Sequence, residues 1–423
     1  MINEPHSKHD IEKKENMFKR TIGLTLLTVF FLYNVKFVFL DGIGSFYIVS
    51  LLFFLAFLSN YKKENFKFNT NSLKISCVWM FFSFFSILKN IDNFDPSFFK
   101  FIILIPFVLM ITPYIVEKMN ASPGEILKII GLATFLNAIV MIVMFLSIDI
   151  RNFYLSFLQL EVVDVLGKDA LKNLLSLRLI GINGFSAYAT AFIQITGAIL
   201  YYIYVTEFTK TGKLKLRNYL VIFIVIISSL IAARSSIAGI IALMAIMLCD
   251  AKNYKKNWFY LVLFFVTLTL LFGLISVLLP PKIANFFTGW ALEFFNSGLK
   301  SGSLQKNLEM YVYSLSDFTI LGDGRLTNGI GGYYKETDVG YFRLLFSSGI
   351  LGCLLMLATL FVVLNPFKLR KIKNSFYLFV NLMLSIIFMF KGFIIYDAFI
   401  CFFMYLSLNL TLTQKEINDS RCE

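Results

Sequence analysis

Charged residues are scarce in this 423-residue chain, in which Asp, Glu, Lys and Arg make up 15% and apolar residues 58%. Soluble domains usually contain about 25% charged and about 45 to 50% apolar residues. A chain with a mean hydropathy of +0.74 has more apolar surface than a water-soluble core can bury. The composition therefore excludes a soluble enzyme, a nucleic-acid-binding protein and a secreted disulfide scaffold.

Residues that bind metals or form disulfides are also few. The five cysteines show no CxxC or similar spacing, so neither a disulfide nor a metal site is predicted. Both histidines, His6 and His9, lie near the amino terminus, so acid-base chemistry elsewhere would use a carboxylate, Tyr, Lys or water. Because the sequence has no Asp-x-Asp pair, a divalent metal holding a diphosphate is not expected. We predict no cofactor.

Apolar runs of around 20 residues, with 49 Phe in the chain, recur throughout the sequence. Runs of this length, separated by thin charged segments, are typical of membrane-spanning helices. The predicted fold class is therefore all-α, a polytopic integral membrane protein with about twelve transmembrane helices. The predicted spans are 17–39, 43–59, 73–88, 98–116, 126–148, 185–205, 219–233, 235–249, 258–279, 341–364, 376–390 and 393–412. The seventh and eighth could also be one long span interrupted at Arg234.

The basic residues are distributed unevenly between the two predicted sides of the membrane. With the amino terminus inside, the inner side has 24 Lys and Arg against 12 Asp and Glu, and the outer side 15 against 14. An inner excess of Lys and Arg determines the orientation of membrane proteins. We attribute the net charge of +13 to topology and contact with anionic lipid headgroups, and expect no nucleic-acid partner.

This topology predicts a single transmembrane domain, 17–412, between cytoplasmic tails at 1–16 and 413–423. The first tail is expected to be disordered. Two periplasmic segments are long, 149–184 and 280–340, and the second precedes the tenth span. A loop of about 60 residues between membrane helices is usually functional. We expect one or two interfacial helices in the first segment and an amphipathic stretch at 283–295 in the second.

Four arginines fall on the predicted outer side: Arg178, Arg234, Arg325 and Arg343. A guanidinium stays protonated and presents a planar set of donors that matches phosphate oxygens, so four of them near one face could bind a diphosphate. Each also has a structural alternative. Arg178 could be interfacial, Arg234 a topology determinant, Arg325 a solvated loop charge, and Arg343 a partner of Asp338.

Asp338 is the strongest carboxylate candidate, because it immediately precedes the tenth span and lies five residues before Arg343. A carboxylate at this place could act as a general base towards a hydroxyl group. It could equally be the N-cap of the tenth helix.

Three stretches resemble the bacterial O-antigen polymerases and O-antigen ligases. RLIGINGFSAYATAF, beginning at Arg178, is similar to their Arg-x-x-Gly element, and AARSSIAGIIAL, beginning at Ala232, to their Ser-Arg-Thr/Ser hairpin. LGDGRLTNG and TDVGYFRLLFSSGILGCLLML, between Leu321 and Leu357, resemble their Gly-x-Gly loop and the following Gly-Ile-x-Gly helix. The order of these motifs agrees as well.

The resemblance implies an inner-membrane glycosyltransferase that acts at the periplasmic face. It would transfer a growing glycan from undecaprenyl diphosphate to a second lipid-linked repeat unit, with a chain-length regulator as a possible partner. Implied catalytic residues are Arg178, Arg234, Arg325 and Asp338. Implied substrate-binding residues are Lys306, in SLQKNLEMY where many relatives have Arg, together with Tyr341 and Arg343.

Other functions stay open at this point. Ligases of the superfamily carry a His near the position of Asp338, which favours a polymerase here, although a ligase or another lipid-linked glycan transferase is an alternative. A lipid-linked oligosaccharide flippase is the alternative of a different class. A transporter would show charges through the midplane of many helices, whereas here they gather on the outer side, and no inverted repeat is visible.

Overall fold

The computed structural model describes residues 8–41, 43–60, 70–93, 95, 122–160, 180–184, 188–209, 211–278, 305, 308–328, 332–364 and 383–394. Within these residues the regular secondary structure is helical, apart from three isolated β-bridges. The longer helices are α1 (Lys8–Tyr33), α2 (Ser45–Asn60), α3 (Thr70–Lys89), α5 (Pro123–Leu146), α8 (Tyr188–Glu207), α9 (Leu216–Ala232), α10 (Ser236–Cys249), α11 (Tyr254–Leu278) and α14 (Gly340–Leu364). Shorter elements are α6 (Ile148–Leu155), η1 (Val38–Leu40), η2 (Ile91–Asn93), η4 (Leu315–Asp317), η5 (Tyr334–Glu336) and a helix at 383–389.

Three of the described helices have the length and apolar composition to cross a membrane: Gly124–Leu146, Tyr188–Glu207 and Gly340–Val362. The all-α class is thereby confirmed for the described part of the chain, and the length and composition of these three helices support its membrane character. The total of twelve spans stays a prediction, and the predicted spans 98–116 and 393–412 lie wholly or almost wholly outside the described residues.

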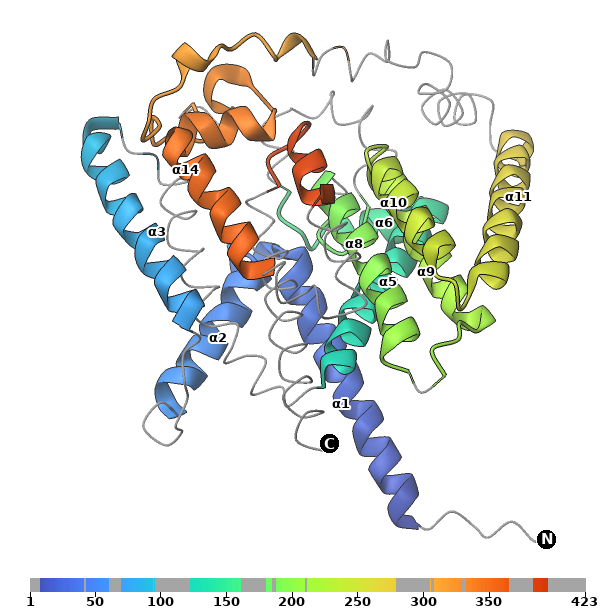
Figure 1. The fold of residues 1–423 in the computed structure, drawn as a ribbon. Coiled ribbons are helices and arrows are strands. Elements are labelled where there is room, and N and C mark those ends of the chain that lie inside the picture. The colour runs from blue at the N-terminus through green and yellow to red at the C-terminus, as the bar shows by residue number, and fades with distance from the viewer. Residues whose placement is uncertain are drawn as a thin grey trace, which may run out of the picture.

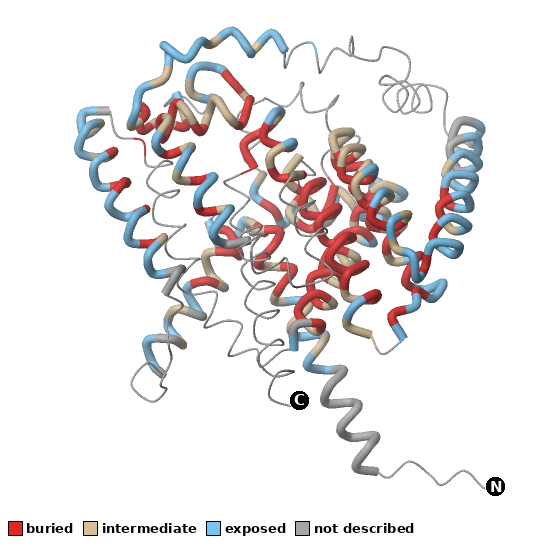
Figure 2. Tube along the Cα trace, viewed as in Figure 1, coloured by how far each residue is buried: buried red, intermediate tan, exposed pale blue. Residues whose placement is uncertain are grey.

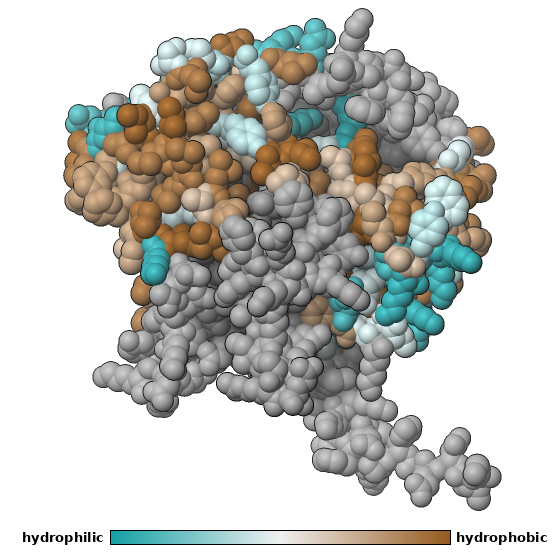
Figure 3. All heavy atoms as spheres, viewed as in Figure 1, coloured by the Kyte–Doolittle hydropathy of each residue, from teal (hydrophilic) through white to brown (hydrophobic). Residues whose placement is uncertain are grey.

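The core lies where α5, α8 and α9 pack together, and Figure 2 shows buried residues concentrated there. Helix α8 is buried almost continuously from Thr190 to Ile203, as expected for a helix that is apolar around its whole circumference. By contrast, α3 and α11 expose large apolar side chains, including Phe81, Phe85 and Phe259, and Figure 3 shows apolar residues over much of the surface. Such outward faces suit a lipid environment.

Polar side chains connect the core helices. The hydroxyl of Tyr33 in α1 donates to Gln194 Oε1 in α8 at 2.7 Å, and Gln194 Nε2 donates to the Ser228 hydroxyl in α9 at 2.8 Å. All three side chains are buried. Hydrogen bonds between membrane helices contribute about 0.6 kcal/mol each on average. Their main effect here is to set the register of the three helices.

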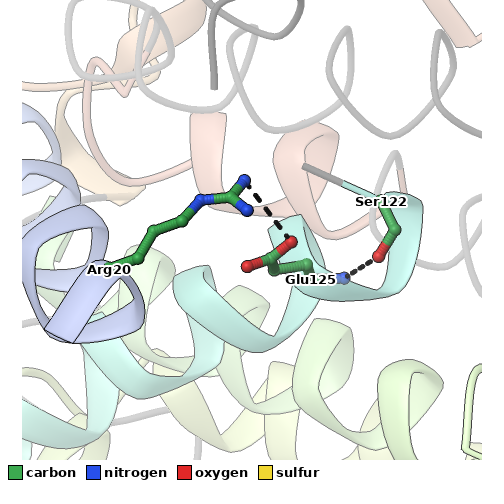
Figure 4. Close-up of polar contacts among 3 residues, drawn as sticks. All are labelled: Arg20, Ser122 and Glu125. Carbon is green, nitrogen blue, oxygen red and sulfur yellow. Dashed lines mark hydrogen bonds and ion pairs between the residues drawn. The ribbon is translucent and has the colours of Figure 1, made fainter. Parts of the chain in front are cut away.

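Helix α5 begins with a complete N-terminal signal. Ser122 is the N-cap and its Oγ accepts the backbone N–H of Glu125, while Pro123 occupies the first helical position. Figure 4 shows Glu125 also facing Arg20 of α1, at 3.8 Å. Both side chains are partly exposed, and such pairs contribute only about 0.2 to 1 kcal/mol. The contact therefore orients α1 against α5 more than it stabilises the pair.

Two predictions about the first span were wrong. Helix α1 begins at Lys8, so residues 8–16 are not a disordered tail, and it ends at Tyr33 instead of Phe39. The end is caused by Asn34, which adopts a left-handed conformation (φ 43°) and accepts the N–H of Phe46 at 3.2 Å. Asn tolerates this conformation better than most residues do. The chain therefore leaves α1 at Tyr33 and reaches α2 through a short connection that contains η1.

Three other predicted segments can be compared with the structure. The stretch 219–249 contains two separate helices, α9 and α10, so the interpretation as a hairpin is confirmed. In the first long segment, α6 is present, whereas 161–179 lies outside the described residues, as does the amphipathic stretch 283–295. Figure 1 places the α9–α10 turn and the start of α14 at one end of the helices and the amino terminus at the other.

Candidate functional site

The structure brings most of the predicted residues that it describes to the region around the start of α14. Arg325, Asp338, Tyr341 and Arg343 lie in or beside the segments 308–328 and 332–346, and Arg234 lies in the α9–α10 turn at the same end of the molecule. Arg178 and Lys306 lie outside the described residues.

A break in α14 receives the Gly-rich loop. Gly349 interrupts the helix with φ 69° and ψ −174°, a conformation that is essentially restricted to glycine. The backbone groups exposed by the break pair with the loop: Ile350 N–H donates to Thr319 O at 3.2 Å, and Gly324 N–H donates to Ser347 O at 3.1 Å. The break therefore provides the hydrogen-bonding edge to which the loop attaches.

Gly322 of the loop meets Gly349 directly. Gly322 has φ 74°, and a Cβ atom at either glycine would clash with the backbone of the other segment. The two glycines allow a backbone contact that larger residues would prevent. The contact joins the LGDG loop to the SSGI segment of α14.

The end of α3 holds the other side of the loop. Lys89 Nζ donates to Gly322 O at 3.0 Å and to Thr319 Oγ1 at 3.1 Å. Asp95, which is buried with 7% of its surface exposed, accepts the N–H of Leu326 and of Thr327, both at 2.8 Å, and the Thr327 hydroxyl at 3.0 Å. A carboxylate that accepts several hydrogen bonds is a strong anchor. Arg325 is thus fixed immediately before Leu326.

Asp95 was not among the predicted site residues. Its only signal in the sequence is a carboxylate in a short segment between apolar runs, a feature that Asp41 and Asp92 share. The sequence offers no indication that Asp95, and not its neighbours, binds a loop more than 230 residues away.

Two neighbouring tyrosines, Tyr333 and Tyr334, each have an arginine over their ring. The guanidinium carbon of Arg343 lies 4.1 Å from the centre of the Tyr333 ring and 5.0 Å from that of Phe393. The guanidinium carbon of Arg325 lies 5.8 Å from the centre of the Tyr334 ring. Cation–π contacts of this kind contribute about 0.5 to 2 kcal/mol and orient the plane of the guanidinium. The structure thus places Arg325 and Arg343 at one turn.

That turn is strained. Lys335 and Glu336 are both left-handed, with φ 56° and 54°, although neither is glycine. The Tyr313 hydroxyl donates to Lys335 O at 2.9 Å and supports the conformation. Burial raises the pKa of the Tyr334 hydroxyl, and the adjacent Asp323 carboxylate adds to the increase, so this hydroxyl donates to Asp323 at 3.3 Å. Strain of this type is concentrated at functional sites.

An aromatic cluster packs next to the turn, since the ring of Phe346 also contacts that of Tyr334. Tyr313, Phe318, Phe342 and Phe346 pack with ring centres between 4.9 and 6.5 Å apart. Phe342 and Phe346 belong to the first turns of α14, whereas the other two come from the segment before it. The cluster therefore fixes the segment 313–318 on the helix that follows Asp338.

The start of α14 also contacts the segment 383–394 and α8. The Tyr341 hydroxyl donates to Ile386 O at 2.7 Å. Gly340 lies so close to the Gly392 carbonyl that a Cβ would clash with it, and Gly392 in turn contacts the Tyr188 ring. These contacts place Asp338 beside the first residues of α8.

Asp338 is not at the N-cap position. Helix α14 begins at Gly340, so Val339 precedes its first residue, and the N–H of Val339 donates to the Thr337 hydroxyl at 3.3 Å. Asp338 is partly buried between the strained turn and the helix. The N-cap position of α14 is therefore that of Val339, whose carbonyl accepts the N–H of Arg343 at 3.0 Å.

Arg234 lies in the turn between α9 and α10, partly buried. Gly239, five residues later, packs against Ile195 of α8. The start of α10, which follows Arg234, therefore packs against α8. The hydroxyls of Ser235 and Ser236 are buried and make no hydrogen bond with the described residues.

The turn that follows Arg178 is held by α5 and α6. The N–H of Ile182 donates to Asn137 Oδ1 at 2.9 Å, and the Tyr154 hydroxyl donates to the Ile182 carbonyl. Burial raises the pKa of Tyr154 to about 12, so the hydroxyl stays a donor. This anchoring fixes the chain only a few residues after Arg178.

Comparison with known proteins adds no assignment. No protein-family model matches the chain, and neither curated proteins nor solved structures include one that is significantly similar to it.

Proposed function

We propose that this protein is a membrane glycosyltransferase that polymerises lipid-linked repeat units, as the O-antigen polymerases do. The observation that carries the proposal is the turn at Tyr333 and Tyr334, whose rings lie against the guanidinium groups of Arg343 and Arg325 and which precedes Asp338 by a few residues in the chain. Arginines gathered in the segment that carries a partly buried carboxylate suit a reaction with a diphosphate leaving group and a hydroxyl nucleophile. The motif resemblance supports the same reaction.

In this reaction the bond between the anomeric carbon of the donor glycan and the diphosphate oxygen breaks. A bond forms between that carbon and a hydroxyl oxygen at the non-reducing end of the acceptor. Undecaprenyl diphosphate leaves with the electron pair, and the hydroxyl proton passes to a base. The donor is already activated, so no nucleotide is needed.

The arginines would stabilise the negative charge that develops on the leaving diphosphate. Arg343 is held between Tyr333 and Phe393, which fixes the direction of its donors. Preorganised donors of this kind are usually the largest contribution to such a reaction. Arg234 and Arg178 would extend the set from the α9–α10 turn and from the segment before Gly181.

Asp338 would accept the proton of the incoming hydroxyl. Tyr341 already donates its hydroxyl to Ile386 O, so we assign it to positioning the start of α14 as well as to the substrate. Lys306 would contribute a further positive charge. The apolar outer faces of α3 and α11 suit a membrane through which both polyprenyl carriers must diffuse. We expect the bacterial inner membrane, with the site facing the periplasm.

The decisive experiment compares lipopolysaccharide from the source bacterium with that of a deletion strain. Loss of the ladder of long chains, with survival of core capped by a single repeat, is the result we expect. Loss of all O-antigen bands would instead indicate a ligase or flippase, and an unchanged ladder would overturn the proposal. Purified protein incubated with undecaprenyl-diphosphate-linked repeats should then yield longer glycans and free undecaprenyl diphosphate, whereas Arg343→Ala should not.

A further inference from the structure

A second concentration of charge lies at the opposite end of the helices from the candidate site. The loop between α8 and α9 carries Lys213 and Lys215, followed by Arg217 in the first turn of α9. The α10–α11 connection carries Lys252, followed by Lys255 and Lys256 in the first turn of α11. All six side chains are exposed. Because α8 begins at the candidate site and has 20 residues, its other end lies about 30 Å away. Figure 3 shows hydrophilic residues gathered over this end of α9 and α11, at the lower right.

A buried polar network joins the two loops. Asn253 Nδ2 donates to the Gly212 carbonyl at 3.1 Å, and Asn253 Oδ1 accepts the N–H of Leu214 at 3.3 Å. Both Asn253 and Leu214 are buried. Gly212 is left-handed, with φ 55°, and the Lys252 ammonium occupies the space that a Cβ there would need. The lysines of the two loops are thus held next to each other.

The network continues into the helices. Tyr219 donates to Asn257 Oδ1 at 2.6 Å, Asn257 Nδ2 donates to the Tyr202 hydroxyl at 3.0 Å, and Tyr202 donates to Asp250 Oδ2 at 2.7 Å. Asn257 is fully buried. These bonds tie α8, α9 and α11 to the carboxylate that ends α10. The relative position of the loops is therefore fixed by the fold.

The acidic residue nearest the patch does not act as an open counter-charge. Asp250 is the single carboxylate between residues 211 and 258. Its Oδ2 accepts Tyr202 and Asn253, and its Oδ1 accepts the N–H of Lys252 at 3.1 Å. Glu207 at the end of α8 and Glu125 near the start of α5, which pairs with Arg20, lie at the same end, so the six exposed cations outnumber the described carboxylates there and can attract an anion from outside the chain.

Helix α11 shows at which depth of a membrane the patch would lie. From Lys255 and Lys256 the exposed residues change to the aromatic Trp258 and Phe259, and then to apolar residues such as Val262. This is the order of headgroup, interface and acyl chain in a bilayer, since Trp prefers the interface. The cations stand at the level of lipid phosphates.

We propose that the paired loops form a binding site for an anionic phospholipid headgroup, with cardiolipin, which carries two phosphates, as the preferred lipid. The rule that basic loops stay inside explains the charge but requires no fixed geometry. The buried network supplies that geometry, which a topology signal alone would not need.

The test uses the full chain purified in detergent and titrated with cardiolipin, phosphatidylglycerol or phosphatidylcholine, with bound lipid counted by native mass spectrometry. We expect cardiolipin to bind most tightly and excess inorganic phosphate not to displace it. The variant Lys252→Gln/Lys255→Gln/Lys256→Gln should weaken cardiolipin binding at least about tenfold, because each basic residue near an anionic surface contributes on the order of fivefold. The matched control, Lys62→Gln/Lys63→Gln/Lys67→Gln, removes the same charge from another predicted inner loop and should change binding less than about twofold.

A further variant separates charge from geometry. Asn253→Ala keeps all six cations but removes the bonds to Gly212 and Leu214, and should weaken cardiolipin binding severalfold. Equal losses in both triple variants, or no loss in either, would overturn the proposal, as would phosphatidylcholine binding equal to that of cardiolipin. If the site triple does not fold, as judged by gel filtration, Lys255→Gln alone replaces it, and unchanged binding would then overturn the proposal.

Discussion

The carboxylate of Asp95 binds Thr327 twice, through the backbone N–H at 2.8 Å and through the hydroxyl at 3.0 Å. The same oxygen accepts the N–H of Leu326. One buried oxygen therefore holds the backbone directly after Arg325 and ties it to the segment that follows α3. Any role of Arg325 in binding an anion depends on this attachment.

Replacement of Asp95 should release the loop. Asp95→Ala leaves two N–H groups and a hydroxyl without their acceptor, at a cost of about 1 to 3 kcal/mol for each buried group. We expect faster proteolytic cleavage between residues 319 and 328 and a loss of polymerisation of at least about tenfold. Asp95→Asn keeps one acceptor oxygen and should be intermediate. The control is Asp92→Ala, since Asp92 is exposed; equal behaviour of the two Ala variants would contradict the assignment.

Gly349 should not tolerate a side chain. Gly349→Ala must adopt φ 69° and ψ −174°, which costs about 1 to 3 kcal/mol, and its Cβ would also clash with the carbonyl of Ile320. The purified variant should unfold at a lower temperature. Gly23→Ala is the control, because nothing lies near Gly23 in α1 and Ala is favoured in a helix by about 0.5 to 1 kcal/mol. An unchanged unfolding temperature for Gly349→Ala would show that the break in α14 is not needed.

The contact between Arg343 and Tyr333 involves the tyrosine ring, so two substitutions can test the ring and the hydroxyl group separately. Tyr333→Phe keeps the ring and should leave glycan polymerisation unchanged. Tyr333→Ala removes the contact and should lower the rate about two- to thirtyfold, the equivalent of about 0.5 to 2 kcal/mol. Arg343→Lys should be worse than Tyr333→Ala, because Lys lacks the planar set of donors. The rates of purified variants with lipid-linked repeats decide the point, and a Tyr333→Ala rate equal to that of the wild type would refute it.

Asp338→Asn tests the general base. The change keeps the shape and removes the basicity, and a general base contributes about 10² to 10⁴-fold. We expect a well-folded protein that yields essentially single-repeat product. Normal polymerisation by this variant would mean that arginine-assisted departure of the diphosphate drives the reaction without a protein base.

The predicted sidedness can be tested by labelling single cysteines in a cysteine-free background. Asn328→Cys, in the outer loop, should react with a membrane-impermeant thiol reagent in intact cells whose outer membrane has been made permeable. Lys213→Cys, in the α8–α9 loop, should react only after the inner membrane is opened. Labelling of Lys213→Cys from outside would place the candidate site in the cytoplasm and overturn the proposed reaction.

Local patterns in the sequence predicted the helices well where the signal was hydrophobic. The hairpin of α9 and α10 follows from the interruption of an apolar stretch at Arg234, and α8 and α14 lie within a few residues of the predicted spans. The errors arose at polar residues. Asn34 ended α1 earlier than hydropathy suggested, and Val339, not Asp338, occupies the position before the first residue of α14. In both places the backbone conformation determines where the helix begins or ends, and hydropathy does not report that conformation.

The sequence by itself determined the all-helical class, the membrane character and the grouping of Arg325, Asp338, Tyr341 and Arg343 within one segment, because all three depend on residues close together in the chain. Only the tertiary structure decided that Asp95 anchors the Gly-rich loop, that Gly322 meets Gly349, and that Asn253 joins two basic loops. Each of these contacts links segments from 27 to more than 200 residues apart, and their partners are ordinary Asp, Gly and Asn residues. Packing of the helices brings them together, and no local pattern distinguishes them from others of the same type.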